Sequence, residues 1–151
     1  MGKIKDDSTR VILRNLLILL PAFYGQYYFL AIILTAGFHA PWSHLGYLPF
    51  DWEQFYFTAG APLAGWLALV LNFLLAVVHI FFIVRSTKNS WDYAVSLGII
   101  HFILTCIVSR RFPLNWIWWV TIILTDVLLV VASELSTYFL SDLRAIDVNH
   151  T

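Results

Sequence analysis

The amino-acid sequence predicts an all-α membrane protein, a four-helix transmembrane bundle with both termini in the cytosol. Three observations predict this fold class. First, 60% of the 151 residues are hydrophobic and only 12% are charged, whereas a soluble domain carries about 25% charged residues. Second, four apolar runs are long enough to cross a bilayer. Third, lysine and arginine are distributed unequally among the segments that join those runs. The length favours a single membrane domain over residues 1–151.

The four apolar runs define the predicted helices. They span about residues 16–38, 63–84, 93–109 and 114–140. A helix needs about 20 mainly apolar residues to cross the hydrocarbon core. The third run is at the short limit of that requirement, and the fourth contains two acidic residues.

Residues 39–62 connect the first two predicted helices. This segment has no lysine or arginine and is rich in aromatic residues, namely Trp42, Tyr47, Phe50, Trp52, Phe55 and Tyr56. Aromatic side chains gather at membrane–water interfaces. We therefore expect a lumenal loop, with a short helix that lies on the membrane and includes Asp51 and Glu53.

The orientation of the bundle follows from the basic residues. Seven of the nine lysines and arginines lie in the N-terminal segment, in the connection after the second run, or in the C-terminal segment. Arg110 and Arg111 are the two on the opposite side. Because cytoplasmic segments carry the excess of Lys and Arg, both termini are predicted to face the cytosol.

Five polar or ionisable residues fall inside the predicted spans. Asn72, His101 and Asp126 lie near the middle of their runs, so we expect that these three side chains can meet at mid-depth. His79 and Glu134 lie nearer the cytosolic surface and form a second potential pair. A charged Asp at the centre of a span costs about 2.5–3.5 kcal/mol on insertion scales. Such residues therefore invite a functional interpretation.

A structural interpretation competes with the functional one for each of these residues. Polar side chains often only hold neighbouring helices together, by about 0.6–2 kcal/mol each. We favour that role for Asn72, His79 and His101, and a hydrogen-bonded or protonated carboxyl for Asp126. Glu134 fits equally well as an interfacial acid that reaches toward water.

The sequence carries no signature of catalysis, of a cofactor or of a metal. His39 and His44 lie five residues apart, without the companions of a zinc site. Cys106 is the only cysteine and lies in an apolar run, where a thiol is usually a small core residue. The nine basic residues are too few for a nucleic-acid surface. The prediction is therefore no enzyme, no cofactor and no nucleic-acid partner.

The second half of the chain contains a series of motifs. They are Arg85-Ser-Thr-Lys88-Asn-Ser-Trp91-Asp92-Tyr93, His101, Arg111-Phe112-Pro113, Trp118-Trp119, Ser133-Glu134 and Asp142-Leu143-Arg144. In the order and spacing of these motifs, the chain resembles the Sys-one family of Golgi membrane proteins. The first half is similar more loosely, through Tyr27-Tyr28 and Phe50-Asp51.

This resemblance implies a place and a function. Members of the family are four-helix proteins of the trans-Golgi with cytosolic termini. They act as membrane receptors for an Arf-related small GTPase, whose N-terminus is acetylated rather than myristoylated and which starts a recruitment cascade. Two positions depart from the family pattern: Gly98 stands where many members have His, and Asp126 lies in a stretch that is expected to be apolar. A divergent paralogue without GTPase recruitment is therefore an alternative.

A cytosolic partner would meet the side of the bundle that carries the termini. We expect Arg85, Lys88, Trp91, Asp92 and Arg144 to bind it, together with the N-terminal segment. Anchoring by the positive-inside rule explains the basic residues equally well. Asp92 is equally explained as a cap at the N-terminus of the third helix. The sequence does not predict the oligomeric state.

The alternative from another class is a small membrane enzyme or a sterol-binding protein. It would use Asp126, Glu134, His79 and His101 as acid–base groups around an apolar pocket. A pocket lined by these groups would favour that alternative, whereas dry packing between helices would favour the receptor.

Overall fold

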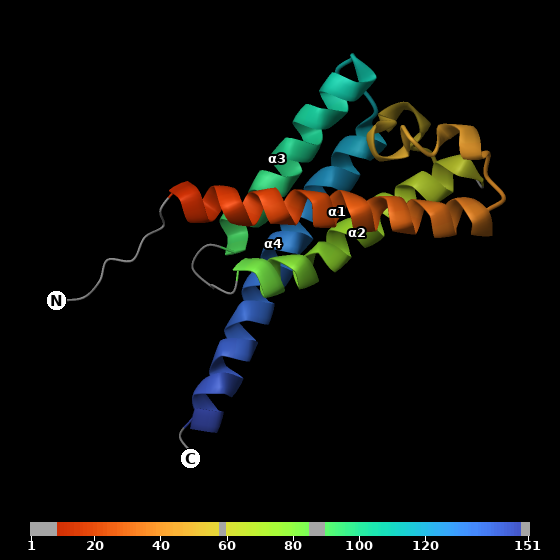
Figure 1. Ribbon diagram of the computed structural model, residues 1–151. Coiled ribbons are helices and arrows are strands. Elements are labelled where there is room, and N and C mark those ends of the chain that lie inside the picture. Colours follow the sequence, from red (N-terminus) through yellow and green to blue (C-terminus); the bar gives the residue numbers. More distant parts are fainter. Residues whose placement is uncertain (1–8, 58–59, 85–89, 149–151) are drawn as a thin grey trace.

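The protein, described here from a computed structural model, is a bundle of four long helices (Figure 1). The backbone is described over residues 9–57, 60–84 and 90–148, and the side chains over 11–139 apart from those gaps and residues 44, 54 and 137. The helices are α1 (Thr9–Gly37), α2 (Ala61–Val84), α3 (Ser90–Ser109) and α4 (Trp116–Val148). Each contains a stretch long and apolar enough to cross a membrane. The prediction of an all-α fold with four spans is therefore confirmed, while the cytosolic orientation stays a prediction.

Two helices extend beyond the apolar runs that predicted them. α1 begins at Thr9 rather than at residue 16, and α4 continues to Val148 rather than ending at residue 140. Their apolar spans are shorter, at Val11–Gly37 and Trp116–Ser136. An apolar run marks the part of a helix that suits hydrocarbon, whereas backbone hydrogen bonding continues as long as the residues tolerate helical geometry.

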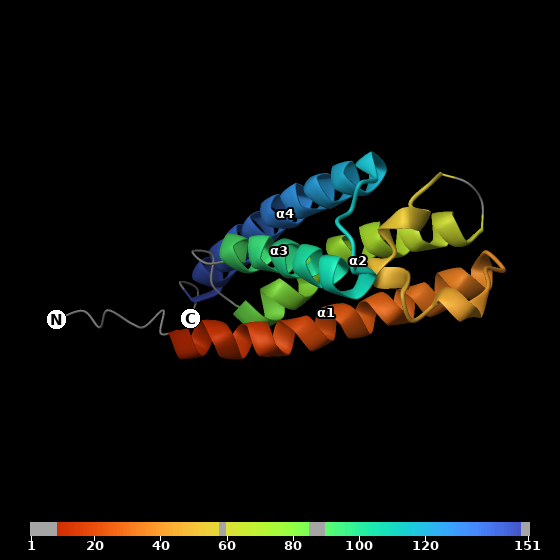
Figure 2. The ribbon, with the colours of Figure 1, turned by 90° about the horizontal axis from the view of Figure 1, so that it is seen from above.

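The four helices alternate in direction. Figure 2 shows the start of α1, the end of α2, the start of α3 and the end of α4 toward one end of the bundle, which we call the terminal end. The opposite end, called the loop end, holds residues 38–57 and the turn between α3 and α4. The main contacts run between α1 and α2, between α2 and α4, and between α3 and α4.

The core is built from matching stripes of large and small side chains. On α1 the fully buried residues follow a spacing of four, namely Leu19, Phe23, Tyr27 and Ala31. On α2 the fully buried positions include the small residues Ala64, Ala68 and Ala76. Small residues let helix backbones approach closely, which is how helices associate within a bilayer.

The loop between α1 and α2 is folded onto the bundle. It contains three short 3-10 helices, η1 (Trp42–His44), η2 (Leu48–Phe50) and η3 (Trp52–Gln54), in place of the expected single helix on the membrane. Trp52 and Phe55 are buried in the protein core, at 8% and 2% exposure, rather than placed in an interfacial belt. Trp42, Tyr47 and Tyr56 are exposed, and their place in an interfacial belt stays a prediction. The loop thus buries apolar surface against the helices, which a sequence pattern alone does not distinguish from lying on lipid.

Candidate functional site

At the terminal end, the start of α3 presents the residues that sequence reasoning assigned to a partner. Trp91 is 47% exposed and Asp92 is exposed in the first helical turn, while the next residue, Tyr93, is buried. Arg85 and Lys88 lie outside the described residues. Arg144 lies in α4, and its side chain is also outside them. The structure therefore places Trp91 and Asp92 on an accessible surface and leaves the three basic residues as predictions.

The start of α1 lies beside the start of α3. The Asn15 side-chain amide donates to the Tyr93 hydroxyl across 3.3 Å. A small pocket of about 40 Å³ lies near this contact, lined by Ile12, Leu16, Asp92, Tyr93 and Ser96. Sequence reasoning placed only a general N-terminal segment here and did not single out Asn15. The signal was a lone amide at the edge of an apolar run.

Inside the bundle, Asn72 joins α2 to α1. Its side-chain oxygen accepts a hydrogen bond from Gln26 Nε2 at 2.9 Å, and Gln26 Nε2 also approaches the Asn72 backbone oxygen at 3.0 Å. Asn72 is fully buried. Gln26 was not among the predicted site residues, although an amide in the middle of a predicted span is the same signal that selected Asn72.

His101 on α3 is enclosed by aromatic rings. The planes of Tyr24, Tyr27 and Phe50 stack beside the imidazole at centroid distances of 6.2, 6.5 and 6.0 Å, and Phe23 and Phe73 meet it edgewise at 6.3 and 5.9 Å. The Tyr24 hydroxyl and His101 Nδ1 form a hydrogen bond of 3.3 Å. This buried ring therefore joins α1, α2, α3 and η2.

Asp126 on α4 lies directly against Gly98 on α3. A Cβ atom added at Gly98 would lie 2.7 Å from Asp126 Oδ1 and 2.9 Å from Oδ2. Asp126 Oδ1 is buried without a hydrogen-bond partner in the part of the chain that the structure describes. The two positions that depart from the family pattern are thus in contact with each other.

His79 and Glu134 are the two remaining polar residues inside the predicted spans. His79 Nδ1 is buried and has no hydrogen-bond partner among the described residues, and Glu134 is exposed. Asn72 and His101 each bond to a side chain of α1, and no hydrogen bond joins either of them to Asp126 within the described ranges. Asn72, His101 and Asp126 therefore lie at separate contacts between helices instead of meeting at one point, and their roles stay predictions.

The Arg111-Phe112-Pro113 motif forms the turn between α3 and α4 at the loop end. Arg111 Nη1 pairs with Glu53 Oε1 across 3.1 Å. Phe112 packs against Phe102 and Trp119, with ring centroids 6.0 and 5.8 Å away. The Trp119 indole N–H donates to the Pro113 carbonyl at 2.8 Å. The buried Trp118 meets the Trp119 ring edgewise at 5.2 Å. The contacts of this motif therefore stabilise the turn between α3 and α4.

Asn115 ties this turn to the loop. Its side-chain oxygen accepts from the backbone N–H of Ile117 at 2.9 Å, which caps the N-terminus of α4. Its Nδ2 donates to the carbonyls of Trp52 and Phe55 at 3.2 and 2.9 Å. Sequence reasoning missed Asn115, although an Asn before an apolar run is a known signal for a helix start.

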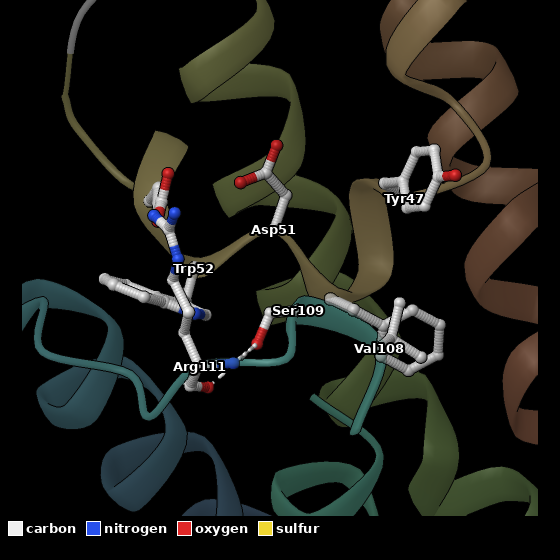
Figure 3. Close-up of a pocket in the computed structure, with 8 residues that line it drawn as sticks. Tyr47, Asp51, Trp52, Val108, Ser109 and Arg111 are labelled. Atoms are coloured by element: carbon white, nitrogen blue, oxygen red, sulfur yellow. Dashed lines mark hydrogen bonds and ion pairs between the residues drawn. The ribbon is translucent and has the colours of Figure 1, made fainter. Parts of the chain in front are cut away.

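A pocket of about 330 Å³ lies between the loop and this turn (Figure 3). Its lining residues are Tyr47, Phe50, Asp51, Trp52, Glu53, Val108, Ser109 and Arg111.

A second, apolar groove of about 300 Å³ lies between α2 and α4, beside the hydrogen bond of 3.0 Å from Trp66 Nε1 to Thr121 Oγ1. None of the five intramembrane polar residues lines either space. Among the described residues, no group of three or more His, Cys, Asp or Glu side chains is placed to hold a metal ion.

Comparison with known proteins adds a relationship to this geometry. A family model described as "Integral membrane protein S linking to the trans Golgi network" matches residues 3–148. Protein SYS1 of Saccharomyces cerevisiae is 31% identical over 88 residues, which cover 58% of this chain and 43% of the yeast protein. The SYS1 homolog of Nematostella vectensis is 31% identical over 83 residues, covering 55% of this chain and 52% of that protein. The matched part thus spans about half the length of each relative. No solved structure matches the chain.

Proposed function

We propose, from the premise that this chain belongs to the SYS1 family of integral membrane proteins of the trans-Golgi network, that it recruits an Arf-like small GTPase to that membrane. The family resemblance suggests this partner. The proposal is a receptor function without catalysis, and it requires the terminal end to face the cytosol.

The observation that carries the proposal is the surface at the start of α3. Trp91 is large, aromatic and 47% exposed, and the carboxylate of Asp92 lies beside it. Tryptophan is enriched among the residues that dominate binding energy at protein interfaces. Tyr93, directly after these two residues, is buried and bonded to α1. Because Tyr93 ties the start of α3 to α1, the surface formed by Trp91 and Asp92 would bind a partner with little loss of conformational entropy.

A receptor of this kind would supply the membrane affinity that the GTPase lacks. One acyl chain provides only marginal membrane binding, and a GTPase without an acyl chain has less still. A membrane protein that binds the GTPase therefore supplies the missing affinity. Basic residues at positions 85, 88 and 144 would add attraction to acidic groups on the partner or on lipid headgroups, and salt would screen that attraction.

The experiment is to measure the membrane-bound fraction of the GTPase in cells that carry Trp91→Ala combined with Asp92→Ala. We expect normal Golgi residence of the receptor and release of the GTPase into the cytosol. Trp42→Ala is the matched control, because Trp42 is 56% exposed at the loop end. Unchanged recruitment by the double variant at normal abundance would remove this surface as the docking site. A complete absence of GTPase binding by the unmodified protein would favour the alternative of a paralogue without recruitment.

Topology is tested separately. A glycosylation sequon inserted near His44 is expected to be glycosylated, and tags on both ends are expected to be accessible from the cytosol in selectively permeabilised cells. Protection of the tags would place the terminal end in the lumen and contradict the proposal.

A further inference from the structure

The pocket at the loop end contains side chains of both charges. Arg111 provides a guanidinium, and Asp51 and Glu53 provide two carboxylates. Figure 3 shows Arg111 and Trp52 on one side of the pocket and Tyr47 on the other, with Asp51 between them. Arg111 and Glu53 pair with each other across 3.1 Å and are 73% and 53% exposed, so both charges of this pair remain open to a ligand that carries charges of both signs. The lining as a whole carries a net charge of one negative unit.

Aromatic side chains surround these charges. Tyr47, Phe50 and Trp52 all line the pocket. The face of an aromatic ring attracts an organic ammonium group, most strongly for Trp. Trp52 is 92% buried, its exposed fraction being 8%, and its indole N–H has no hydrogen-bond partner among the described residues. The three rings therefore form a wall of the pocket that suits an organic ammonium group.

The pocket lies where a membrane span ends. Val108 and Ser109, which line it, are the last residues of α3 and of the third candidate span. Along α3 toward the terminal end, three isoleucines are exposed on one face at a spacing of four residues. They are Ile99, Ile103 and Ile107, with exposed fractions of 54%, 47% and 63%. This apolar stripe leads along the helix toward Val108. An acyl chain that lies on the stripe would therefore bring its headgroup to the pocket.

We propose that this pocket binds the zwitterionic headgroup of a phospholipid from the leaflet at the loop end. The phosphate approaches Arg111, and the ammonium approaches Glu53 and Asp51 against the aromatic wall. An anionic lipid such as phosphatidylglycerol is disfavoured, because the lining keeps one net negative charge beyond the Arg111–Glu53 pair and nothing in that headgroup compensates it. This inference does not depend on GTPase recruitment, which concerns the opposite end of the bundle.

The test is to reconstitute the full chain in bilayers with equal amounts of phosphatidylcholine and phosphatidylglycerol of identical acyl chains. Retained lipids are then counted by native mass spectrometry. We expect phosphatidylcholine to be retained in about two- to fivefold preference, the range that exposed charge pairs support. Equal retention of the two lipids would overturn the proposal.

Two variants distinguish a headgroup site from a structural role. Glu53→Gln removes a partner of the ammonium, so the preference should move toward phosphatidylglycerol. Arg111→Gln removes the partner of the phosphate, so the retention of both lipids should fall. Arg14→Gln, which removes an exposed arginine at the terminal end, is the control and should leave the retention of phosphatidylcholine unchanged. If both pocket variants change retention in the same direction and by the same factor, the residues act only through the shared ion pair and the proposal fails.

Soluble phosphocholine separates a lipid site from a site for a free ligand. Without acyl chains on the α3 stripe, millimolar phosphocholine should leave the bound lipid in place. Complete displacement at an equal concentration would assign the pocket to a soluble ligand and contradict the lipid proposal.

Discussion

Two polar contacts inside the bundle differ in how they join their helices. Between α1 and α2, the Gln26 amide N–H donates to the Asn72 side-chain oxygen at 2.9 Å, while Asn72 Nδ2 has no partner among the described residues. Between α3 and α4, the carboxyl of Asp126 lies against Gly98, and its Oδ1 has no partner among the described residues. The first contact depends on a hydrogen bond and the second on shape. A polar residue in a membrane helix can thus serve association either through its bonding or through the volume it fills.

The largest effect should come from filling the space at Gly98. In Gly98→Ala the new methyl group would come 2.7 Å from Asp126 Oδ1, so α3 and α4 must separate or the carboxyl must move. We expect the free energy of unfolding in detergent to fall by about 1–3 kcal/mol, the usual cost of overpacking. Unfolding by SDS titration measures it.

A companion variant shows whether the two residues act together. Asp126→Ala removes the carboxyl, so adding it to Gly98→Ala should restore part of the loss. Strictly additive effects of the two substitutions would mean that the contact is not steric.

The next effect concerns the bonded contact. Asn72→Leu removes the side-chain acceptor of the partly buried Gln26 amide and leaves it only the backbone carbonyl of residue 72, which should cost about 1–2 kcal/mol. Replacing Gln26 by Leu as well removes the poorly bonded amide, so the double variant should be at least as stable as Asn72→Leu alone. The coupling energy from this cycle is the measurement. A value near zero would show that the hydrogen bond contributes no stability.

A smaller effect is expected when the charge of Asp126 is removed but its shape is kept. Asp126→Asn should change the free energy of unfolding by less than about 1 kcal/mol, because the amide has nearly the same volume and is less costly to desolvate. Normal stability together with a complete loss of function would instead support an acid–base role for this carboxyl. Cellular recruitment and SDS unfolding, measured on the same variant, separate the two outcomes.

A comparably small effect is expected at the contact between α1 and α3. The hydrogen bond from Asn15 to the Tyr93 hydroxyl is 3.3 Å long and lies near the terminal end. Tyr93→Phe should therefore cost about 0.5–1 kcal/mol. A larger loss would show that this contact determines how α1 and α3 are arranged beneath the surface of Trp91 and Asp92.

The sequence predicted which polar residues lie at mid-depth better than it predicted which residues they contact. It selected Asn72, His101 and Asp126 as polar groups at mid-depth, and all three lie inside spans. Their expected meeting is replaced by separate neighbours: Asn72 bonds to Gln26, His101 bonds to Tyr24, and Asp126 packs at Gly98 without a hydrogen bond from Oδ1 among the described residues. Gly98 and Asp126 were each recognised as unusual, but nothing in the linear order of the chain indicates that they touch.

The sequence by itself determined the four apolar spans, the alternating direction that successive crossings require, and the family to which the chain belongs. These properties follow from the transfer free energy of each residue, which depends on its type and adds along the chain. Only the tertiary structure decided the folding of Trp52 and Phe55 into the core, the tie of Asn115 to the loop and the contact of Asp126 with Gly98. These contacts depend on the rotation of each helix about its axis and on which helices are neighbours. Many packing interactions set both together, and no single run of sequence contains that information.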